Sequence, residues 1–325
     1  MSPMANLQTV SLGPGGLTVP ALGVGTWAWG DSLFWDYGKA YSDSDLQAAF
    51  NASLDAGLRL FDTAEIYGFG QSERLLGSFM QQRFQSADQQ AILATKYFPL
   101  PWRFSKQSVA DALTASLDRL QVASVALYQV HWPLDFLLNQ TDLMQALAAE
   151  VKRGRIGAVG VSNYSAQQMR QAHSYLAEQG VPLAVNQVQY SLLYRNIETS
   201  GVMATARELG VTILAYSPLA QGLLTGKYTP ETRLKPGGAR WLNPRFSQEG
   251  LTKLMPVIRA LREIGENRER TPAQVALNWL VCQGNVLPIP GAKNAHQASQ
   301  NAGALGWELT PEERDRLGQL TQNYG

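Results

Sequence analysis

Residues 91–131 read AILATKYFPLPWRFSKQSVADALTASLDRLQVASVALYQVH, and this stretch indicates how the chain folds. Two short apolar runs, Ala91–Lys96 and Val125–His131, enclose the helix-like segment Ser105–Leu120. The apolar runs are almost free of charge, which is typical of strands that are covered on both faces. Ser105 is a suitable N-cap for the segment that follows it. The stretch therefore predicts one strand–helix–strand unit of a parallel sheet.

The same unit recurs along the whole chain. Further strands are predicted at Ala21–Gly25, Leu58–Asp62, Ile156–Val161, Leu183–Gln187, Val211–Tyr216 and Asn285–Pro290. Further helices are predicted at Asp43–Ala56, Ser72–Arg83, Asp142–Lys152, Ser165–Gln179, Thr199–Leu209, Thr252–Asn267, Pro272–Gln283, Ala295–Leu305 and Pro311–Gln319. Helix starts are marked by Ser165, Thr271-Pro272 and Thr310-Pro311, and helix ends by Gly57 and Gly210.

Eight strand–helix periods favour an α/β fold of the (β/α)8 TIM-barrel type, with residues 1–325 as a single domain. The main alternative is a doubly wound sheet, which carries the spacing G-x-G-x-x-G after its first strand. The segment Gly23–Gly30 lacks that spacing. The longest irregular stretch is Pro218–Gly250, and a loop of that length inside a compact domain usually serves function.

Composition excludes several classes of function. The chain has 27 Lys and Arg against 26 Asp and Glu, and this net charge of +1 argues against a nucleic-acid-binding protein. The single Cys282 rules out an intrachain disulfide, an iron–sulfur cluster and a thiolate zinc site. With only three scattered histidines, we expect no metal site. Neither a secretory signal nor a membrane-spanning run is apparent, so we expect a cytoplasmic protein.

Polar side chains occur at the predicted carboxyl ends of successive strands. Asp62 ends the second strand and Tyr67 follows it, while Lys96 and His131 end the third and fourth. Ser162 and Asn163 follow the fifth strand, Gln187 ends the sixth, and Tyr216 and Ser217 lie at the end of the seventh. Each residue alone has a structural explanation, such as helix capping by Asp62 or core packing of His131. Their joint placement at one rim of a barrel favours an active site.

Seven motifs in order resemble the aldo-keto reductase family. They are FDTAEIYG at 61–68, ATK at 94–96, YQVHWP at 128–133, GVSNY at 160–164, NQVQYS at 186–191, AYSPL at 215–219 continuing into 222–227, and PIPGA at 288–292. Within the family, residues 27–30, 101–103 and 303–307 resemble plant plastid and cyanobacterial members of the pyridoxal-reductase type and an uncharacterised plastid oxidoreductase. The resemblance implies a barrel with an N-terminal β-hairpin and a C-terminal extra helix.

The resemblance also implies NADPH-dependent reduction of aldehydes or ketones to alcohols. Tyr67 would donate a proton to the carbonyl oxygen, assisted by Lys96, Asp62 and His131. A free tyrosine has a pKa of about 10, so we expect the Lys96 charge to lower the pKa of Tyr67 towards neutrality. Asp62 would hold Lys96 in place, and His131 would orient the carbonyl oxygen.

The same resemblance assigns residues to the cofactor NADP(H). Ser162, Asn163 and Gln187 would hold the nicotinamide carboxamide, and Tyr216 would stack on its ring, although barrel packing is another explanation for Tyr216. Ser217, Leu219, Gln221, Gly222 and Lys227 would line the diphosphate, although Lys227 is otherwise an ordinary solvated lysine. Lys293 is available to the 2′-phosphate, whereas Gln297 and Gln300 replace an Arg and a Glu that are frequent in the family. The remaining assigned positions are Gly25, Thr26, Trp27, Pro218, Ile289, Pro290, Gly291 and Asn301.

The substrate pocket is expected to be aromatic. Trp29, Trp102 and Trp132 follow strand ends, where they would suit flat or apolar carbonyl compounds, although rim packing explains them equally well. Arg103 is a candidate contact for an anionic group. No obligate protein partner is evident.

Two other functions remain open at this point. The first is an NADP(H)-binding regulatory subunit with little turnover, resembling the potassium-channel β subunits. The second is a Schiff-base aldolase with Lys96 as nucleophile, which Asp62 opposes because it would raise the pKa of that lysine.

Overall fold

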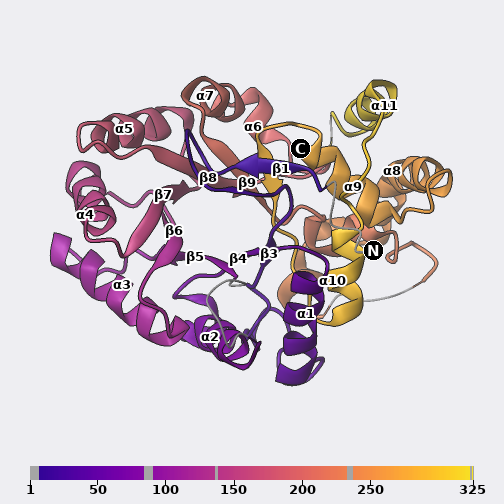
Figure 1. The fold of residues 1–325 in the computed structure, drawn as a ribbon. Coiled ribbons are helices and arrows are strands. Elements are labelled where there is room, and N and C mark those ends of the chain that lie inside the picture. Colours follow the sequence, from indigo (N-terminus) through magenta and orange to yellow (C-terminus); the bar gives the residue numbers. More distant parts are fainter. Residues whose placement is uncertain (1–6, 84–90, 136–137, 233–236, 323, 325) are drawn as a thin grey trace.

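The computed structural model describes residues 7–83, 91–135, 138–232, 237–322 and 324, so residues 1–6 and residues 233–236 of the irregular stretch lie outside it. Eight parallel strands form the wall of a barrel with helices around it (Figure 1). The strands are β3 (Val24–Gly25), β4 (Leu60–Asp62), β5 (Ile92–Tyr97), β6 (Val125–Val130), β7 (Ile156–Ser162), β8 (Leu183–Gln189), β9 (Thr212–Tyr216) and β10 (Val286–Pro288).

The barrel closes between its first and last strands. Each strand pairs with the next one along the chain, from β3 to β10. At the seam, the N–H groups of Gly23 and Gly25 donate to the carbonyl oxygens of Pro288 and Pro290, each over 3.0 Å. The predicted (β/α)8 fold is therefore confirmed.

The helices are α1 (Asp43–Asp55), α2 (Gln71–Arg83), α3 (Lys106–Leu120), α4 (Gln140–Lys152), α5 (Ala166–Ala177), α6 (Asn196–Thr199), α7 (Val202–Leu209), α8 (Gln248–Glu266), α9 (Pro272–Val281), α10 (Ala295–Ala302) and α11 (Pro311–Thr321). The predicted N-caps are confirmed, because Ser105, Ser165, Thr271 and Thr310 each accept a hydrogen bond from a backbone N–H of the first turn. Gly210 ends α7 in the left-handed conformation that favours glycine.

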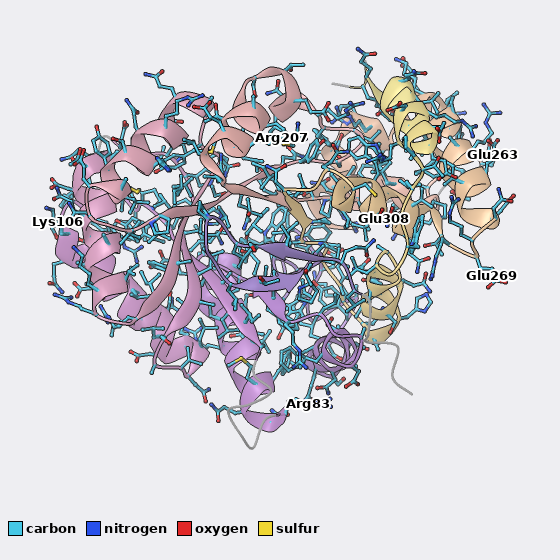
Figure 2. The ribbon with its side chains drawn as sticks, turned by 45° about the horizontal axis from the view of Figure 1, so that its top comes forward. Arg83, Lys106, Arg207, Glu263, Glu269 and Glu308 are labelled. Atoms are coloured by element: carbon cyan, nitrogen blue, oxygen red, sulfur yellow. The ribbon has the colours of Figure 1, made fainter. Side chains whose placement is uncertain are left out.

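Charged side chains lie mainly outside this barrel. Figure 2 shows Arg83, Lys106, Arg207, Glu263, Glu269 and Glu308 on the outer surface of the molecule. The interior side chains are largely Leu, Val, Ile and Ala. Asp62 and Lys96 are exceptions, since both are buried at the centre. Because an isolated buried charge is costly, these two residues call for a partner and an explanation.

The amino-terminal hairpin closes one end of the barrel. Strands β1 (Thr9–Ser11) and β2 (Thr18–Pro20) are antiparallel, as the resemblance implied. Gly13, in the turn between them, donates to the Thr212 hydroxyl at the start of β9 over 3.1 Å. Leu12 and Val19 pack against Leu60 and Leu214 inside the barrel. The hairpin therefore covers the end at which the strands begin, and the carboxyl ends of the strands face the opposite rim.

Several predicted bounds differ from the observed ones by a few residues, and three differences change how an element is described. The first strand is limited to Val24–Gly25, because only these residues pair along β4. The helix predicted at Thr199–Leu209 is interrupted by Gly201, whose φ of 82° is left-handed, so that α6 and α7 are separate. The stretch Pro218–Gly250 is not wholly irregular, since it contains the 3₁₀ turns η4 (Ala220–Thr225), η5 (Gly238–Leu242) and η6 (Pro244–Phe246), and α8 begins at Gln248.

No helix among the described residues combines the length and the apolar character needed to cross a bilayer.

Candidate active site

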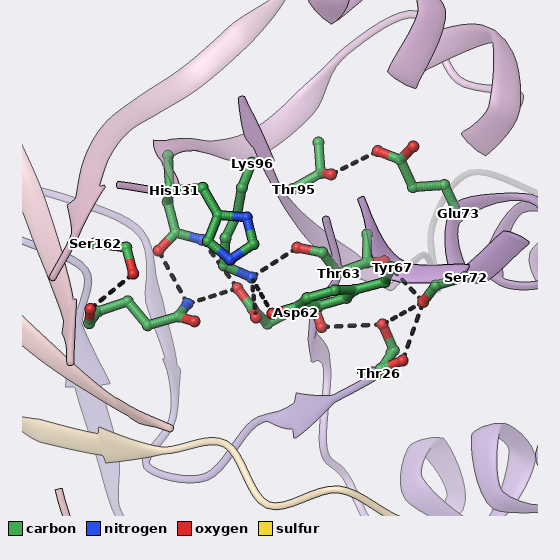
Figure 3. A network of polar contacts seen from close by, with 12 residues as sticks. Thr26, Asp62, Thr63, Tyr67, Ser72, Glu73, Thr95, Lys96, His131 and Ser162 are labelled. Carbon is green, nitrogen blue, oxygen red and sulfur yellow. Dashed lines mark hydrogen bonds and ion pairs between the residues drawn. The ribbon is translucent and has the colours of Figure 1, made fainter. Parts of the chain in front are cut away.

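A buried ion pair occupies the centre of the rim. The Lys96 Nζ atom on β5 lies 2.6 Å from Asp62 Oδ2 at the end of β4, and it also donates to the Thr63 carbonyl oxygen over 2.8 Å (Figure 3). Burial alone would lower the pKa of Lys96, but the charge and hydrogen bond of Asp62 outweigh burial and raise it. Lys96 is therefore an ammonium group, and this protonation state opposes a Schiff-base nucleophile.

The other carboxylate oxygen of Asp62 is held by two amides. Gln129 Nε2 and Gln187 Nε2 donate to Asp62 Oδ1 over 2.9 and 2.8 Å. These bonds satisfy the second oxygen of a buried carboxylate, which Lys96 alone would leave without a hydrogen-bond partner. The sequence analysis missed Gln129, although a signal was present: it is the polar residue of an apolar strand and lies two positions before His131, on the same face.

Tyr67 lies beside the ion pair. It begins the 3₁₀ turn η2 (Tyr67–Gly70), and Lys96 Nζ is 3.4 Å from its hydroxyl and 4.9 Å from its ring centroid. Burial raises the pKa of Tyr67, and this effect exceeds the lowering by the Lys96 charge. The expected shift of the Tyr67 pKa towards neutrality is therefore corrected to a shift in the opposite direction, because burial outweighs the lysine charge and the Asp62 carboxylate adds to the effect of burial. The phenol thus keeps its proton at neutral pH.

His131 lies next to Tyr67 as a neutral imidazole. Its ring is edge-on to the rings of Tyr67 and Phe98, with centroids 5.7 and 5.5 Å away. Burial, with the nearby Lys96 charge, lowers the pKa of His131 to about 3. Its Nδ1 atom is buried and has no hydrogen-bond partner among the described residues. A neutral imidazole retains one N–H, which can donate to a carbonyl oxygen.

The residues assigned to nicotinamide surround one edge of this group. Asn163, in a left-handed conformation with φ 63°, donates to the His131 carbonyl oxygen over 3.1 Å and accepts from the Tyr216 hydroxyl. The Ser162 hydroxyl donates to the Gln187 backbone oxygen over 2.9 Å. The side chain of Gln187 bonds Asp62, so in this structure it supports the ion pair rather than reaching outward.

The segment after β9 forms a strained loop. Ser217, Ala220 and Gln221 have φ values of 50°, 48° and 58°, and Gly222 has a φ of 98°. Such conformations are uncommon for residues other than glycine and are typical of ligand-binding loops. The loop contains the other residues assigned to the diphosphate, Leu219 and Lys227, and also Pro218, which is among the remaining positions assigned to the cofactor. Within it, the buried Gln221 Oε1 atom has no hydrogen-bond partner among the described residues.

A cluster of three cations includes Lys227 of that loop and two residues from other segments. Lys293 Nζ and Arg240 Cζ are 4.7 and 4.9 Å from the ring centroid of Trp35. Burial and the charges of Arg240 and Lys227 lower the pKa of Lys293 to about 8. We call Lys227, Arg240 and Lys293 the cation cluster. Arg240 was missed from the sequence because it lies in η5, far along the chain from Lys293.

The neighbouring amides at the adenosine end have structural partners. Gln297 Oε1 accepts the Lys293 backbone N–H over 2.9 Å, and Asn301 donates to the Gly291 carbonyl oxygen over 3.2 Å. The contact of Gln300 is through its backbone and not its side-chain amide: the Gln300 backbone carbonyl oxygen accepts from Gln274 Nε2 over 2.9 Å. These contacts fix the turn that carries Lys293 at the start of α10.

Residues assigned to the first and last strands belong chiefly to the barrel seam. Gly25 pairs with Gly291, while Ile289 and Pro290 are buried beside it. The Thr26 hydroxyl is completely buried, where it contacts Ser72 and the Asp62 carbonyl oxygen (Figure 3). Trp27 is half-buried, and its ring centroid is 6.4 Å from that of Tyr67, so it remains available at the rim.

The contacts of Trp29 and Arg103 contradict the roles expected for these two residues. Trp29 is wholly buried and donates to the Ala292 carbonyl oxygen over 2.9 Å, so it is a core residue and does not line a pocket. Arg103 is paired with Glu65, so it does not present a free charge to an anionic substrate. Trp102 and Trp132 are 66% and 43% exposed. These two tryptophans therefore remain as candidate contacts for a substrate.

Among the described residues, no three His, Cys, Asp or Glu side chains gather closely enough to hold a metal ion.

The fold and site together define a barrel protein with a buried Asp–Lys pair, a tyrosine and a neutral histidine at its carboxyl rim. The model of the Aldo/keto reductase family matches residues 21–322, and the chain belongs to this family.

Individual relatives agree with that assignment. The chain is 42% identical over 318 residues to the chloroplastic pyridoxal reductase of Arabidopsis thaliana, covering 95% of this chain and 85% of the relative. A glycerol dehydrogenase structure from Gluconobacter oxydans superposes with a TM-score of 0.82 at 28% identity, covering 97% and 95% of the two chains. An aldo/keto reductase structure from Klebsiella pneumoniae, in complex with NADP and acetate, gives a TM-score of 0.76 at 28% identity and covers 97% and 96%.

Proposed function

We propose that this protein is an NADPH-dependent oxidoreductase that reduces aldehydes or ketones to alcohols. The observation that carries the proposal is the chain Asp62–Lys96–Tyr67, with a neutral His131 beside it. The NADP in the Klebsiella relative supports the choice of cofactor. A cytoplasmic location remains a prediction, because the Arabidopsis relative is described as chloroplastic.

The residues present fit a dinucleotide phosphate. Trp35 Nε1 and Gln221 Oε1 are buried polar atoms without partners among the described residues. Both residues contact Arg240 of the cation cluster: its guanidinium lies over the Trp35 ring and donates to the Gln221 backbone oxygen. Like charges that lie close together are unfavourable unless an anion accompanies them, and the carboxylates of Asp36 and Asp31 offset only part of the effect of burial and of the neighbouring cations on Lys293. Lys227 would face the diphosphate, whereas Lys293 and Arg240 would face the 2′-phosphate. Arg240 would thus supply a second cation in place of the family Arg that Gln297 replaces.

Each residue of the site has a distinct role in this proposal. NADPH, when bound, supplies the hydride for the carbonyl carbon. Tyr67 donates the proton to the carbonyl oxygen, and its raised pKa keeps that proton in place until the oxygen becomes basic. Lys96 stabilises the phenolate that remains, and Asp62 fixes the position of Lys96. His131 donates one N–H to the carbonyl oxygen and orients it.

The substrate would enter between exposed aromatic side chains. Trp102 and Trp132 lie on the loops that follow β5 and β6, and Trp27 borders Tyr67. Such surfaces suit flat or apolar carbonyl compounds. The Arabidopsis relative makes pyridoxal a reasonable first member of an aldehyde panel.

The decisive experiment removes the proton donor alone. We expect Tyr67→Phe to lose about 100-fold or more in kcat, since general acid catalysis contributes about 10²–10⁴-fold. The dissociation constant for NADPH, measured by tryptophan fluorescence, should change by less than about twofold, because the ring is retained.

Trp132→Phe serves as a control, because it changes an exposed pocket side chain and leaves the proton donor intact. Full activity of Tyr67→Phe would refute the role of Tyr67. Tight NADPH binding by the wild-type protein without turnover of any aldehyde in the panel would instead favour a regulatory subunit.

A further inference from the structure

A second buried ion pair lies next to the catalytic group. Arg103 Nη1 is 2.5 Å from Glu65 Oε1, and Arg103 Nη2 is 2.9 Å from Glu65 Oε2. The exposed fractions of the two side chains are 16% and 8%. The pair is therefore bidentate and largely shielded from water. The proton-transfer scheme described above does not use it.

Both residues of the pair converge on the backbone of Phe98. Glu65 Oε1 accepts the Phe98 N–H over 2.6 Å, and Arg103 Nη1 donates to the Phe98 carbonyl oxygen over 2.8 Å. Phe98 directly follows β5, and the described strand ladders end at Tyr97, so the other backbone contact of Phe98 is a turn bond in which its carbonyl oxygen accepts the Leu100 N–H over 2.9 Å. The ion pair thus fixes both polar backbone groups of one residue. The Arg103 guanidinium also lies over the Tyr97 ring, 5.2 Å from its centroid, and this contact limits its movement.

Phe98 in turn contacts the imidazole of His131. The two ring centroids are 5.5 Å apart in an edge-on arrangement. The backbone N–H of His131 donates to the carbonyl oxygen of Tyr97, the residue before Phe98. Glu65 lies two residues before Tyr67, in the segment that leads from β4 to η2. One ion pair therefore connects the segments that carry Tyr67, Phe98 and His131.

We propose that Glu65 and Arg103 are positioning residues, which hold Phe98 against His131 and so orient the imidazole toward the substrate. The placement of His131 by this pair does not depend on the proposed reductase function, but the expected effect on turnover does. A gain in stability alone is a weak explanation for the pair, because desolvation offsets much of the attraction between buried charges. The convergence of both partners on one backbone residue is better explained by a requirement for precise placement.

The first test observes His131 directly in the cofactor-free protein. The chain has three histidines, so protein labelled with ¹³C at histidine gives three ring signals, and His131→Gln identifies one of them. We expect Arg103→Met to move the His131 signal and to leave those of His173 and His296 in place. Phe98→Leu retains the ion pair but removes the ring, and it should move the same signal.

The control variant is Arg170→Met, which breaks another bidentate Arg–Glu pair. Arg170 and Glu208 are 47% and 57% exposed, and they lie on the outer helices α5 and α7. This variant should leave the His131 signal unchanged. An unmoved His131 signal in Arg103→Met would overturn the proposal, whatever Phe98→Leu does, because loss of the Phe98 ring shifts a neighbouring signal by itself. If Arg103→Met does not fold, Glu65→Gln decides the same question.

The second test measures turnover and cofactor binding separately. We expect Arg103→Met to lower kcat by about 10- to 100-fold, the range that a small misplacement of a catalytic group produces. NADPH affinity should stay within about twofold, because the cation cluster is elsewhere. Arg103→Lys should recover part of kcat, since an ammonium replaces only part of the bidentate contact.

The two tests fail in different ways. Wild-type protein without turnover would contradict the proposed function, yet the His131 signal would still decide whether the pair positions the imidazole. A moved His131 signal with unchanged kcat would show that the ion pair places the imidazole but that this placement does not affect catalysis.

Discussion

At the scale of single residues, the site depends on charges that the core would not tolerate alone. Lys96 and Asp62 are buried together, and Gln129 and Gln187 complete the coordination of the carboxylate. Tyr67 and His131 are kept in their neutral forms because burial disfavours charge on each of them. The site thus combines one fixed ion pair, Asp62–Lys96, with two neutral hydrogen-bonding groups, Tyr67 and His131.

The state of His131 gives a prediction about pH. Its folded-state pKa of about 3 lies below its ordinary value of 6.5, so the unfolded chain binds a proton first as the pH falls. The stability associated with neutral His131 is present above about pH 6.5 and is lost as the pH falls towards 3.

We therefore expect the His131 NMR signal to stay constant from about pH 5 to 8 in the folded protein and to titrate near pH 6.5 in urea. The pH profile of kcat/KM should lack a histidine ionisation in that range. A folded-state transition near pH 6.5 would contradict the neutral assignment.

The cation cluster gives a second prediction at this scale. Lys293→Met and Arg240→Met should each weaken NADPH binding by about 10-fold or more, since hydrogen bonds to charged groups contribute about 1.5–3 kcal/mol. Binding of NADH, which lacks the 2′-phosphate, should change much less. Fluorescence titration with both nucleotides provides the measurement, and Lys253→Met on the exposed face of α8 provides the control. Equal losses for NADH and NADPH would show that these residues do not contact the 2′-phosphate.

At the scale of elements, the start of α2 locks the segments around the site. The Ser72 hydroxyl donates to the Thr26 carbonyl oxygen and contacts the hydroxyls of Thr26 and Thr63, all in the core. The next residue, Glu73, accepts from Thr95 and Arg119, each over 2.6 Å. Thr95 precedes Lys96 on β5 and Thr63 directly follows Asp62 of β4, so α2 is connected to the segments that carry the Asp62–Lys96 ion pair.

Removal of the Ser72 hydroxyl should therefore be costly. We expect Ser72→Ala to lower the free energy of unfolding by about 1–3 kcal/mol, because it leaves buried hydroxyl and carbonyl groups without partners. Ser78→Ala, on the solvent side of the same helix, should change it by less than about 0.5 kcal/mol. Urea unfolding followed by circular dichroism measures both. Equal effects would show that the buried network adds nothing beyond helix propensity.

At the scale of the whole molecule, the barrel depends on the seam between β3 and β10. A Cβ atom at Gly25 would lie 2.7 Å from the Ile289 carbonyl oxygen, which is backbone and cannot rotate away. A Cβ atom at Gly291 would meet its nearest neighbour, the Gly25 carbonyl oxygen, at an ordinary 3.5 Å. The two glycines face each other across the seam, but only Gly25 is required by close approach.

Alanine substitutions at these two positions form a matched pair. Gly25→Ala should lower the free energy of unfolding by about 1–3 kcal/mol, as forced overpacking typically does. Gly291→Ala should be nearly neutral, within about 0.5 kcal/mol. Thermal unfolding of the cofactor-free variants tests this expectation. A neutral Gly25→Ala would mean that the seam opens without cost.

Much of this architecture was readable from the sequence. Uncharged runs such as Val125–Val130 become buried strands because helices cover their outer face and side chains of the barrel interior pack on their inner face, and Thr271 and Thr310 start helices because capping is a local interaction. The rim positions of Asp62, Lys96 and His131 followed from the rule that barrel strands present their carboxyl ends together.

What only the tertiary structure decided depends on contacts between residues far apart along the chain. Arg240 joins Lys293 over one tryptophan, Gln129 bonds Asp62, and Arg103 is neutralised by Glu65. Trp29 follows a strand, as a pocket residue would, yet it lies in the core. Local pattern sets the strands, helices and rim because backbone propensity and burial act over a few residues. The partner of each buried charge, and the direction of its pKa shift, depend on the whole barrel.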